Sequence, residues 1–271
     1  MNISIIGPFS SLLKNKELIY NLVKRDITSK YKGSMLGVFW SIFTPVFMLA
    51  VYTFVFSVVF NTRWSGGEST GSKSEFALLL FSGLIVFNYF SEVINRAPTL
   101  IISHSNYVKK VVFPLEILSW VSVLSALFNA LTSFLVWFIF YIIEMGMPHI
   151  TILELPLVLL PLIFLVLGLS WFLSSLGVFL RDIGQIIGII VTMIMFLSPI
   201  FYPLSAVPEK YQNILSLNPI APIIESVRGV LFYGHGFNYG EYIVYLIISI
   251  IICVLGFLFF EKTRKGFSDV L

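Results

Sequence analysis

Charged residues are scarce in this sequence. They make up 11% of its 271 residues, whereas 58% are hydrophobic and the mean hydropathy is +0.95. A soluble domain carries roughly a quarter charged residues. The chain therefore cannot cover a water-facing surface of ordinary charge density, so its apolar side chains must face lipid as well as each other. Composition excludes an ordinary soluble domain and predicts an all-α integral membrane protein.

The sequence also lacks the residue groups that enzymes and metal sites need. Cys253 is the only cysteine, so neither a disulfide framework nor a Cys/His zinc pattern can be drawn. The three histidines lie far apart in the sequence, and no metalloprotease or nucleophile-elbow motif is present. A net charge of +3 is too small to indicate nucleic-acid binding. We expect no catalytic residue, no metal and no cofactor in this chain.

Acidic side chains are missing from the middle of the apolar segments. Glu92, Glu116, Glu154 and Glu241 all lie near segment ends. A charge in mid-membrane costs about 2.5–3.5 kcal/mol on insertion scales, and ion-coupled transporters retain such charges for function. No residue remains to carry a proton or hold a sodium ion. If this protein moves a solute uphill, the energy must come from another subunit.

Long apolar runs are abundant. A helix needs about 20 apolar residues to cross a hydrocarbon core of about 30 Å. Six segments satisfy this requirement, namely 36–60, 76–95, 111–143, 155–180, 183–203 and 242–260. We expect one membrane domain over residues 1–271 with six transmembrane helices.

The distribution of basic residues predicts the orientation. An even number of spans places both termini on one side, and positive charge marks the cytoplasmic side. Thirteen of the 17 lysine and arginine residues lie on the side that holds the termini. The opposite side holds only Arg63, Lys73, Lys210 and Arg228. Both termini are therefore predicted to be cytoplasmic, and no cleavable signal peptide is expected.

Two segments on the predicted cytoplasmic side have more structure than a connector needs. In residues 11–32 apolar side chains recur every four residues, which predicts an amphipathic helix in the membrane interface. Residues 98–110 begin with Pro98, which suits the first turn of a helix, and end in Lys109 and Lys110. The simpler interpretation of residues 11–32 is a positively charged membrane anchor, and that of residues 98–110 is a plain connector. The alternative is that both segments contact a cytoplasmic partner.

The segment 204–233, on the opposite side, is apolar but interrupted by proline. Five prolines between Ser198 and Gly240 exclude one continuous helix. Asn218-Pro219 has the form of an N-cap followed by proline at the first helical position, with the helix running to Phe232. We expect short re-entrant helices that satisfy their own backbone hydrogen bonds.

Aromatic residues make up 16% of the sequence. Core packing or contact with lipid explains many of them, but an aromatic lining would also suit a sugar polymer, because sugar rings stack on aromatic planes. The candidates for such a path are Trp40, Phe43, Phe47, Phe87, Tyr89, Phe196, Phe201 and Tyr202. Gly184 and Gly188 have the spacing that permits close helix approach, which would suit a dimer seam.

Five groups of residues together resemble the ABC-2 permeases that export polysaccharides. The first lies between Arg25 and Trp40, and the second is the loop that ends in Phe113-Pro114. Phe179-Leu-Arg181-Asp182, Ser198-Pro199-Ile-Phe-Tyr202-Pro203 and Asn218-Pro219 follow in the family's order. Ser119-Trp120 departs from the family, in which a Leu-Pro-like pair is expected. The resemblance covers essentially the whole chain.

The resemblance implies a membrane subunit that pairs with a second copy and with two cytoplasmic ATPase subunits, which hold the ATP and Mg. The expected substrate is a lipid-linked polysaccharide, and the expected location is the bacterial inner membrane. Residues implied to contact the ATPase are Arg25, Lys30, Thr99, Ser103, His104, Tyr107, Lys109 and Lys110. Residues implied to form an outer gate are Pro199, Pro203, Asn218 and Pro219.

Several functions stay open at this point. O-antigen export is the leading expectation, and capsule, teichoic acid or a small amphipathic drug would suit the same architecture. A polyprenyl-dependent membrane enzyme is a distant alternative, disfavoured by the missing acidic and histidine cluster. A channel or scaffold without energy input is disfavoured by the loop 98–110.

Overall fold

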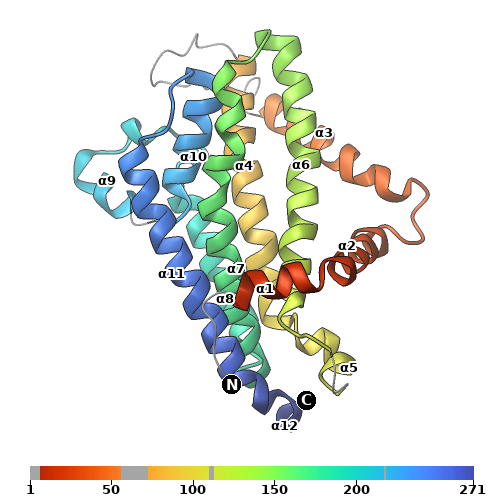
Figure 1. Cartoon of the computed structure of the whole chain (residues 1–271). Helices are drawn as coiled ribbons and strands as arrows, with labels where there is room; N and C mark the ends of the chain where they lie inside the picture. The colour runs from red at the N-terminus through yellow and green to blue at the C-terminus, as the bar shows by residue number, and fades with distance from the viewer. Residues whose placement is uncertain (1–6, 56–72, 110–112, 217) are drawn as a thin grey trace.

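A computed structural model describes residues 7–55, 73–109, 113–216 and 218–271. Within these ranges the regular structure is entirely helical, without a strand. The longest helices are α4 (Lys73–Arg96), α6 (Ile117–Met145), α7 (Leu155–Phe179) and α11 (Tyr239–Thr263), which run side by side as a bundle (Figure 1). The prediction of an all-helical chain is confirmed for the described residues.

These four helices are long and apolar enough to cross a membrane. Two other apolar helices are shorter, namely α3 (Trp40–Thr53), which follows the 3-10 turn η1 (Gly37–Phe39), and α8 (Ile183–Leu197). At 1.5 Å per residue, the 15 residues of α8 span about 22 Å, less than a hydrocarbon core of about 30 Å. Six crossings therefore stay a prediction, while a membrane protein with several apolar helices is established.

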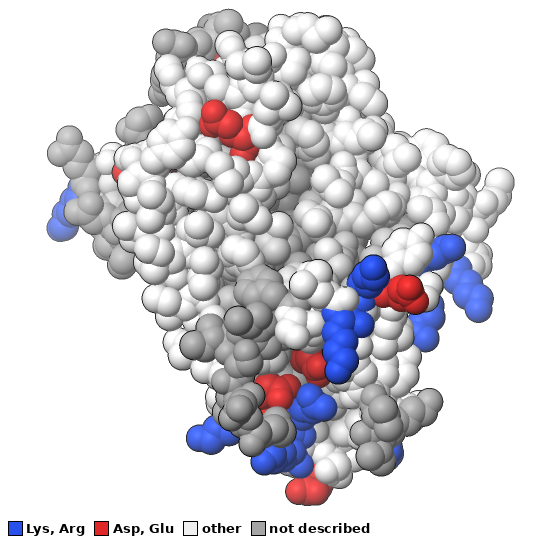
Figure 2. Space-filling view, viewed as in Figure 1, with Lys and Arg blue, Asp and Glu red and all other residues white. Residues whose placement is uncertain are grey.

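The N-terminal helices lie across the bundle instead of along it (Figure 1). They are α1 (Gly7–Lys14) and α2 (Lys16–Lys30), and α2 buries Ile19 and Leu22 against the core. The C-terminal pieces η8 (Arg264–Gly266) and α12 (Phe267–Val270) lie toward the same end of the bundle. Lysine and arginine side chains gather over this lower part of the visible face, below a broad uncharged band (Figure 2). We call this end the basic end.

The segment 98–110 breaks into short pieces instead of forming one helix. They are η3 (Ala97–Thr99), η4 (Ile102–His104) and α5 (Ser105–Val108). Pro98 lies in the first turn of η3, as its position predicted. The Ser103 hydroxyl and His104 Nδ1 both bond to the Leu100 carbonyl oxygen, at 3.1 and 2.8 Å. Such local side-chain bonds compete with a continuous helix.

The segment 204–233 is also divided, at the other end of the bundle. It contains η6 (Leu204–Ala206), α9 (Glu209–Ser216), α10 (Ala221–Arg228) and the π-helix η7 (Gly229–Tyr233). Helix α10 begins at Ala221 with Pro222 in its first turn, so the prediction that Pro219 starts this helix was wrong. The Asn218 carboxamide still accepts a hydrogen bond from the Ile220 N–H at 3.0 Å, and this bond forms a turn that precedes the helix.

Glycine allows the closest helix contacts in the core. A Cβ on Gly256 of α11 would lie 2.1 Å from the Gly168 carbonyl oxygen of α7. A Cβ on Gly177 would lie 1.8 Å from the Pro98 carbonyl oxygen, so α7 also packs backbone to backbone against η3. These contacts hold α7 against α11 and η3 without polar side chains.

The remaining connection is the 3-10 turn η5 (Ile150–Glu154), which leads into α7. Two buried tryptophans link the long helices through their indole N–H groups. Trp137 donates to the Leu78 carbonyl oxygen and Trp171 to the Glu116 carbonyl oxygen, both at 3.0 Å. Buried indoles with satisfied N–H groups fix the register of neighbouring helices.

Candidate transport path and coupling region

Two ion pairs join the crosswise helix α2 to the bundle. Arg96, at the end of α4, donates two hydrogen bonds to the Asp26 carboxylate, one of them at 2.7 Å. One turn away Lys30 forms an ion pair with Glu92 of α4. Both Glu92 carboxylate oxygens also accept from the Asn129 carboxamide of α6 at 2.9 Å. We call these five residues the inner clasp.

The environment of Asp26 favours its charged form. Burial raises the pKa of Asp26, but the hydrogen bonds and positive charge of Arg96 lower it, with further lowering by Ser125 and Lys30. The net result is a pKa below the ordinary value of an aspartate. Asp26 is therefore ionised and paired with Arg96 at neutral pH.

Helix α2 also contacts the segment 98–110. Arg25 donates to the Tyr107 hydroxyl at 2.8 Å. The Tyr107 ring is stacked between two others, with centroids 4.2 Å from Phe113 and 5.7 Å from His104. These contacts connect the segment 98–110 to α2, and the inner clasp connects α2 to α4.

The other residues expected to meet a partner lie at the same end. Thr99, Ser103 and Lys109 are exposed. The Thr99 hydroxyl donates to the Arg96 carbonyl oxygen at 3.2 Å, which links the exposed segment to α4. Lys110 lies outside the described residues. The chain thus offers an exposed surface at the basic end, directly beside the inner clasp.

Three of the predicted path residues form an exposed aromatic row along α3. Trp40, Phe43 and Phe47 are 39%, 41% and 59% exposed. Successive ring centroids are 6.4 Å apart, first edge to face and then stacked. Among the described residues this row is accessible, so it is available to a substrate, to lipid or to a second copy.

The other predicted path residues are divided between surface and interior. Phe196 of α8 is 62% exposed and lies 6.4 Å from the half-buried Phe201, and the Tyr202 hydroxyl donates to the Phe196 carbonyl oxygen at 3.1 Å. Phe87 and Tyr89 of α4 are only 4% and 5% exposed. These two do not share a surface with the α3 row, and they would line a path only if the bundle opened. Their role as lining residues stays a prediction.

The predicted gate residues meet where α8 joins the outer segment. Asn218 donates to the Ser198 hydroxyl at 2.8 Å, and the Tyr245 hydroxyl of α11 donates to the Pro219 carbonyl oxygen. Pro203 lies beside η6. Hydrogen bonds therefore tie α8, the outer segment and α11 together.

Arg228 at the end of α10 is the centre of this outer region, and its placement corrects an expectation. Its basic charge was assigned to an outer loop, but its side chain is 1% exposed. It donates to the carbonyl oxygens of Pro199 at 2.5 Å, Ile200 at 2.9 Å and Leu79 at 3.3 Å, and it pairs with Glu225. We call Arg228 and these three carbonyl groups the outer anchor.

This geometry can be compared with known families. Residues 17–232 match the ABC-2 type transporter family, which is more than three quarters of the chain. The chain belongs to this family. In this ABC-2 chain, the contacts of α2 with α4 and with the segment 98–110 lie at the basic end, beside the exposed Thr99, Ser103 and Lys109.

Curated ABC-2 relatives match along nearly their full length. An O-antigen export system permease protein, RfbA, of Klebsiella pneumoniae is 26% identical over 257 residues, covering 94% of this chain and 95% of the relative. The protein of the same name in Myxococcus xanthus is 25% identical and covers 95% and 96%. The polysialic acid transport protein KpsM of Escherichia coli is 23% identical and covers 92% and 94%.

Sequence reasoning missed several residues of this ABC-2 chain that make the polar contacts just described. They include Glu92, Arg96, Asn129 and Arg228. Glu92 and Arg96 are four residues apart and so share one helix face, which was a usable signal for a polar partner. Asn129 and Arg228 carry no comparable signal, because their partners are distant in sequence. The partners of Arg228 are, in addition, mainly backbone carbonyl groups, which any residue type supplies.

Over the described ranges, no three histidine, cysteine, aspartate or glutamate side chains are grouped as metal ligands. Cys253 is buried where α7 contacts α11, and there it packs as a small apolar side chain. The absence of a cofactor in this chain stays an expectation.

Proposed function

We propose that this chain is the membrane subunit of an ATP-driven exporter that moves a lipid-linked polysaccharide, foremost O-antigen, out of the bacterial cytoplasm. Two copies would form the membrane unit and two cytoplasmic ATPase subunits would drive it. The chain would cross the inner membrane six times, through α3, α4, α6, α7, α8 and α11, with its basic end in the cytoplasm.

The observation that carries the proposal is the connection from the exposed segment 98–110 to the bundle. Arg25 joins this segment to α2, and the inner clasp joins α2 to α4. A partner that presses on the basic end would therefore move α2, which is packed against α6 and joined to α4 by ion pairs. The full-length similarity to permeases named for O-antigen export supports the substrate class.

The exposed aromatic row on α3 supports a carbohydrate substrate. Its three rings present flat, uncharged surfaces, and such surfaces suit the apolar faces of sugar rings better than a tight ionic site would. Across a dimer seam, the row on one copy and the exposed face of α8 would border a wide path. The Pro199–Pro219 region would close this path on the outer side.

Capsular polysaccharide is the nearest competing substrate, because a polysialic acid transport protein is also among the relatives. Teichoic acid and small amphipathic drugs would use the same architecture. A polyprenyl-dependent enzyme and an unpowered channel would not need the contacts at the basic end.

Coupling is tested by the double substitution Lys109→Glu and Lys110→Glu in a strain that lacks the native gene. We expect loss of surface polysaccharide with normal membrane insertion, because the substitution reverses the charge of the surface beside the inner clasp, and a partner that binds the basic surface would be repelled by the acidic one. Surface polymer is measured with a specific antibody. Lys210→Glu, an exposed lysine on α9, is the matched control and should export normally. Normal export by the double variant would refute the coupling role, and unchanged export in the deletion strain would refute the function.

The path is tested by Trp40→Ala with Phe43→Ala. We expect slower polymer export with little change in ATP hydrolysis by the assembled complex, because the variant removes stacking surfaces and leaves the basic end intact. Export is followed as surface polymer after induction. Ile139→Ala, on the exposed face of α6, is the control. If export is unchanged, the α3 row contacts lipid or the second copy instead of the substrate.

A further inference from the structure

Helix α2 has a side that is covered neither by the bundle nor by the segment 98–110. Its inner side buries Ile19 against the core. On another side, Arg25 donates to the Tyr107 hydroxyl at 2.8 Å. Tyr20 precedes Arg25 by five residues, so it lies about 140° around the helix from it. The Tyr20 side chain is 66% exposed, so this third side is free among the described residues.

Two lysines flank Tyr20 on this free side. Lys16, Tyr20 and Lys24 are spaced four residues apart, which places them on successive turns of one helix face. We call these three residues the α2 stripe. Both lysines are exposed, and neither forms an ion pair or a hydrogen bond with a described residue. The other two basic residues of α2, Arg25 and Lys30, both have side-chain partners.

The ion pairs of α2 show which way the α2 stripe faces. Asp26 pairs with Arg96, the last residue of α4. Lys30 pairs with Glu92, which lies one helical turn farther from the basic end. A rotation of about 40° around α2, from Asp26 to Lys30, therefore leads away from the basic end. Tyr20 lies about 120° from Asp26 in the same direction, so the α2 stripe faces outward and away from the basic end.

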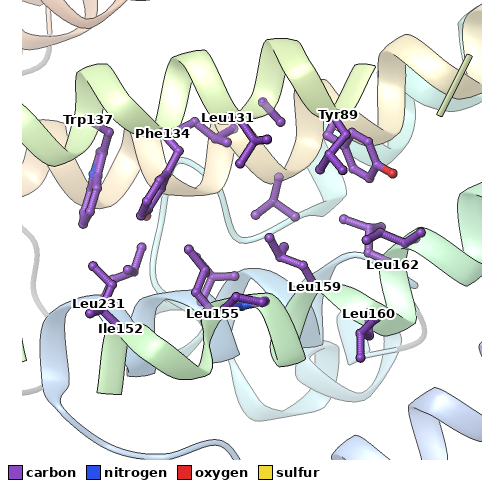
Figure 3. A pocket seen from close by; sticks show the side chains of 18 of the residues that line it. Tyr89, Leu131, Phe134, Trp137, Ile152, Leu155, Leu159, Leu160, Leu162 and Leu231 are labelled. Carbon is purple, nitrogen blue, oxygen red and sulfur yellow. The ribbon is translucent and has the colours of Figure 1, made fainter. Parts of the chain in front are cut away.

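The bundle changes from charged to apolar at the level of α2. Glu92 of α4 meets α2, whereas Tyr89, three residues away, lies at the end of a cavity of about 490 Å³ between α6 and α7 (Figure 3). Every described residue that lines this cavity is uncharged. On the visible face, lysine and arginine gather below a broad uncharged band (Figure 2). In a bilayer such a boundary is where the lipid headgroups lie.

We propose that the α2 stripe binds the headgroups of anionic phospholipids in the leaflet beside the basic end. The ammonium groups of Lys16 and Lys24 would pair with lipid phosphate groups, and the Tyr20 ring would lie at the edge of the acyl chains. Glu17, next to Lys16, lies in the first turn of α2, where the helix dipole favours a carboxylate. The site goes beyond the proposed function, because it does not depend on which solute is exported. It would hold one side of α2 at the membrane while the Arg25 side stays open to a protein partner.

The site is tested by hydrogen exchange of the full chain in nanodiscs of phosphatidylcholine, with and without phosphatidylglycerol. Exchange in peptides of α2 is followed by mass spectrometry. We expect several-fold slower exchange with phosphatidylglycerol, because a helix held at the anionic surface opens less often. Lys16→Gln with Lys24→Gln should remove most of this difference. Lys262→Gln with Lys265→Gln is the matched control, because it removes the same charge from exposed lysines of the basic end that lie outside α2.

Folding of each variant is checked by the reactivity of the buried Cys253 toward a thiol dye. Equal exchange of α2 in the two kinds of nanodisc would overturn the proposal. An equal loss in the control pair would also overturn it, because net charge alone would then explain the attraction. If the α2 variant keeps the lipid effect but no longer co-purifies with a cytoplasmic subunit, the α2 stripe binds a protein and not lipid.

Discussion

The two ends of α4 are held by different kinds of contact. At the basic end the inner clasp pairs charges with charges, and the side chains of Lys30 and Glu92 are 33% and 30% exposed. At the other end the outer anchor has one arginine, 1% exposed, that bonds mainly to backbone carbonyl groups. The first contact is accessible to water and ions, whereas the second is sealed from both.

This difference has a mechanical consequence. Partly exposed ion pairs contribute little net free energy, so they can break and re-form at low cost. A buried arginine cannot leave its carbonyl partners without losing several hydrogen bonds at once. We infer that the outer anchor acts as a fixed point, while the inner clasp is the end at which α2 can move relative to α4.

Arg228→Met should have the largest effect on stability. It leaves the Pro199, Ile200 and Leu79 carbonyl oxygens without their buried donor, and we expect a loss of about 3–5 kcal/mol in the free energy of unfolding. Unfolding in detergent is followed with a thiol dye that reacts with the buried Cys253. Lys210→Met, at an exposed lysine, should leave the midpoint unchanged. Equal midpoints for the two variants would show that the outer anchor is not a fixed point.

The fold was largely predictable because its main signal, long uncharged apolar runs, is local in sequence. The predicted segments 76–95, 155–180 and 242–260 correspond to α4, α7 and α11. Each of these helices begins and ends within a few residues of its predicted bounds. Close packing was not predictable in the same way. The spacing of Gly184 and Gly188 suggested close helix approach at a dimer seam, which stays a prediction. Within the single chain a Cβ on Gly188 would meet nothing within 4 Å, so Gly188 marks no close contact inside the bundle.

The tight contacts use Gly168, Gly177 and Gly256 instead, and each depends on a partner that is distant in sequence. The same limit applies to the candidate site. Arg25, Lys30 and Tyr107 were expected from the family resemblance. In the structure Arg25 bonds to Tyr107, and Lys30 pairs with Glu92. Asn129 and Arg228 could not be predicted, because a polar side chain in an apolar segment gives no indication of which backbone or side chain it will meet.

Exchange of the Asp26–Arg96 pair should have an intermediate effect. Asp26→Arg or Arg96→Asp alone places like charges together in a half-buried contact, and we expect each to cost about 2 kcal/mol. The double exchange restores opposite charges and should recover part of this loss. Full additivity of the two single effects in a double-mutant cycle would mean that the pair does not interact.

The same pair predicts a pH dependence. Because the folded-state pKa of Asp26 is lowered, its stabilising contribution is fully present above the ordinary aspartate value of about 3.9 and is lost as pH falls through the folded value. Asp26→Asn should therefore lower stability at neutral pH and reduce the acid sensitivity of the protein. A variant that keeps the full acid sensitivity would contradict this assignment.

Lys30→Met should have the smallest effect and the clearest salt dependence. Glu92 keeps its two hydrogen bonds from Asn129, so we expect a loss of no more than about 1 kcal/mol in the free energy of unfolding. The difference from the unmodified chain should shrink between low salt and about 1 M salt, where the Debye length falls to about 3 Å. The effect of Arg228→Met should persist at high salt, because its partners are sealed from ions. If salt weakens both effects equally, the two ends of α4 are held alike, and the inference that only the basic end moves is wrong.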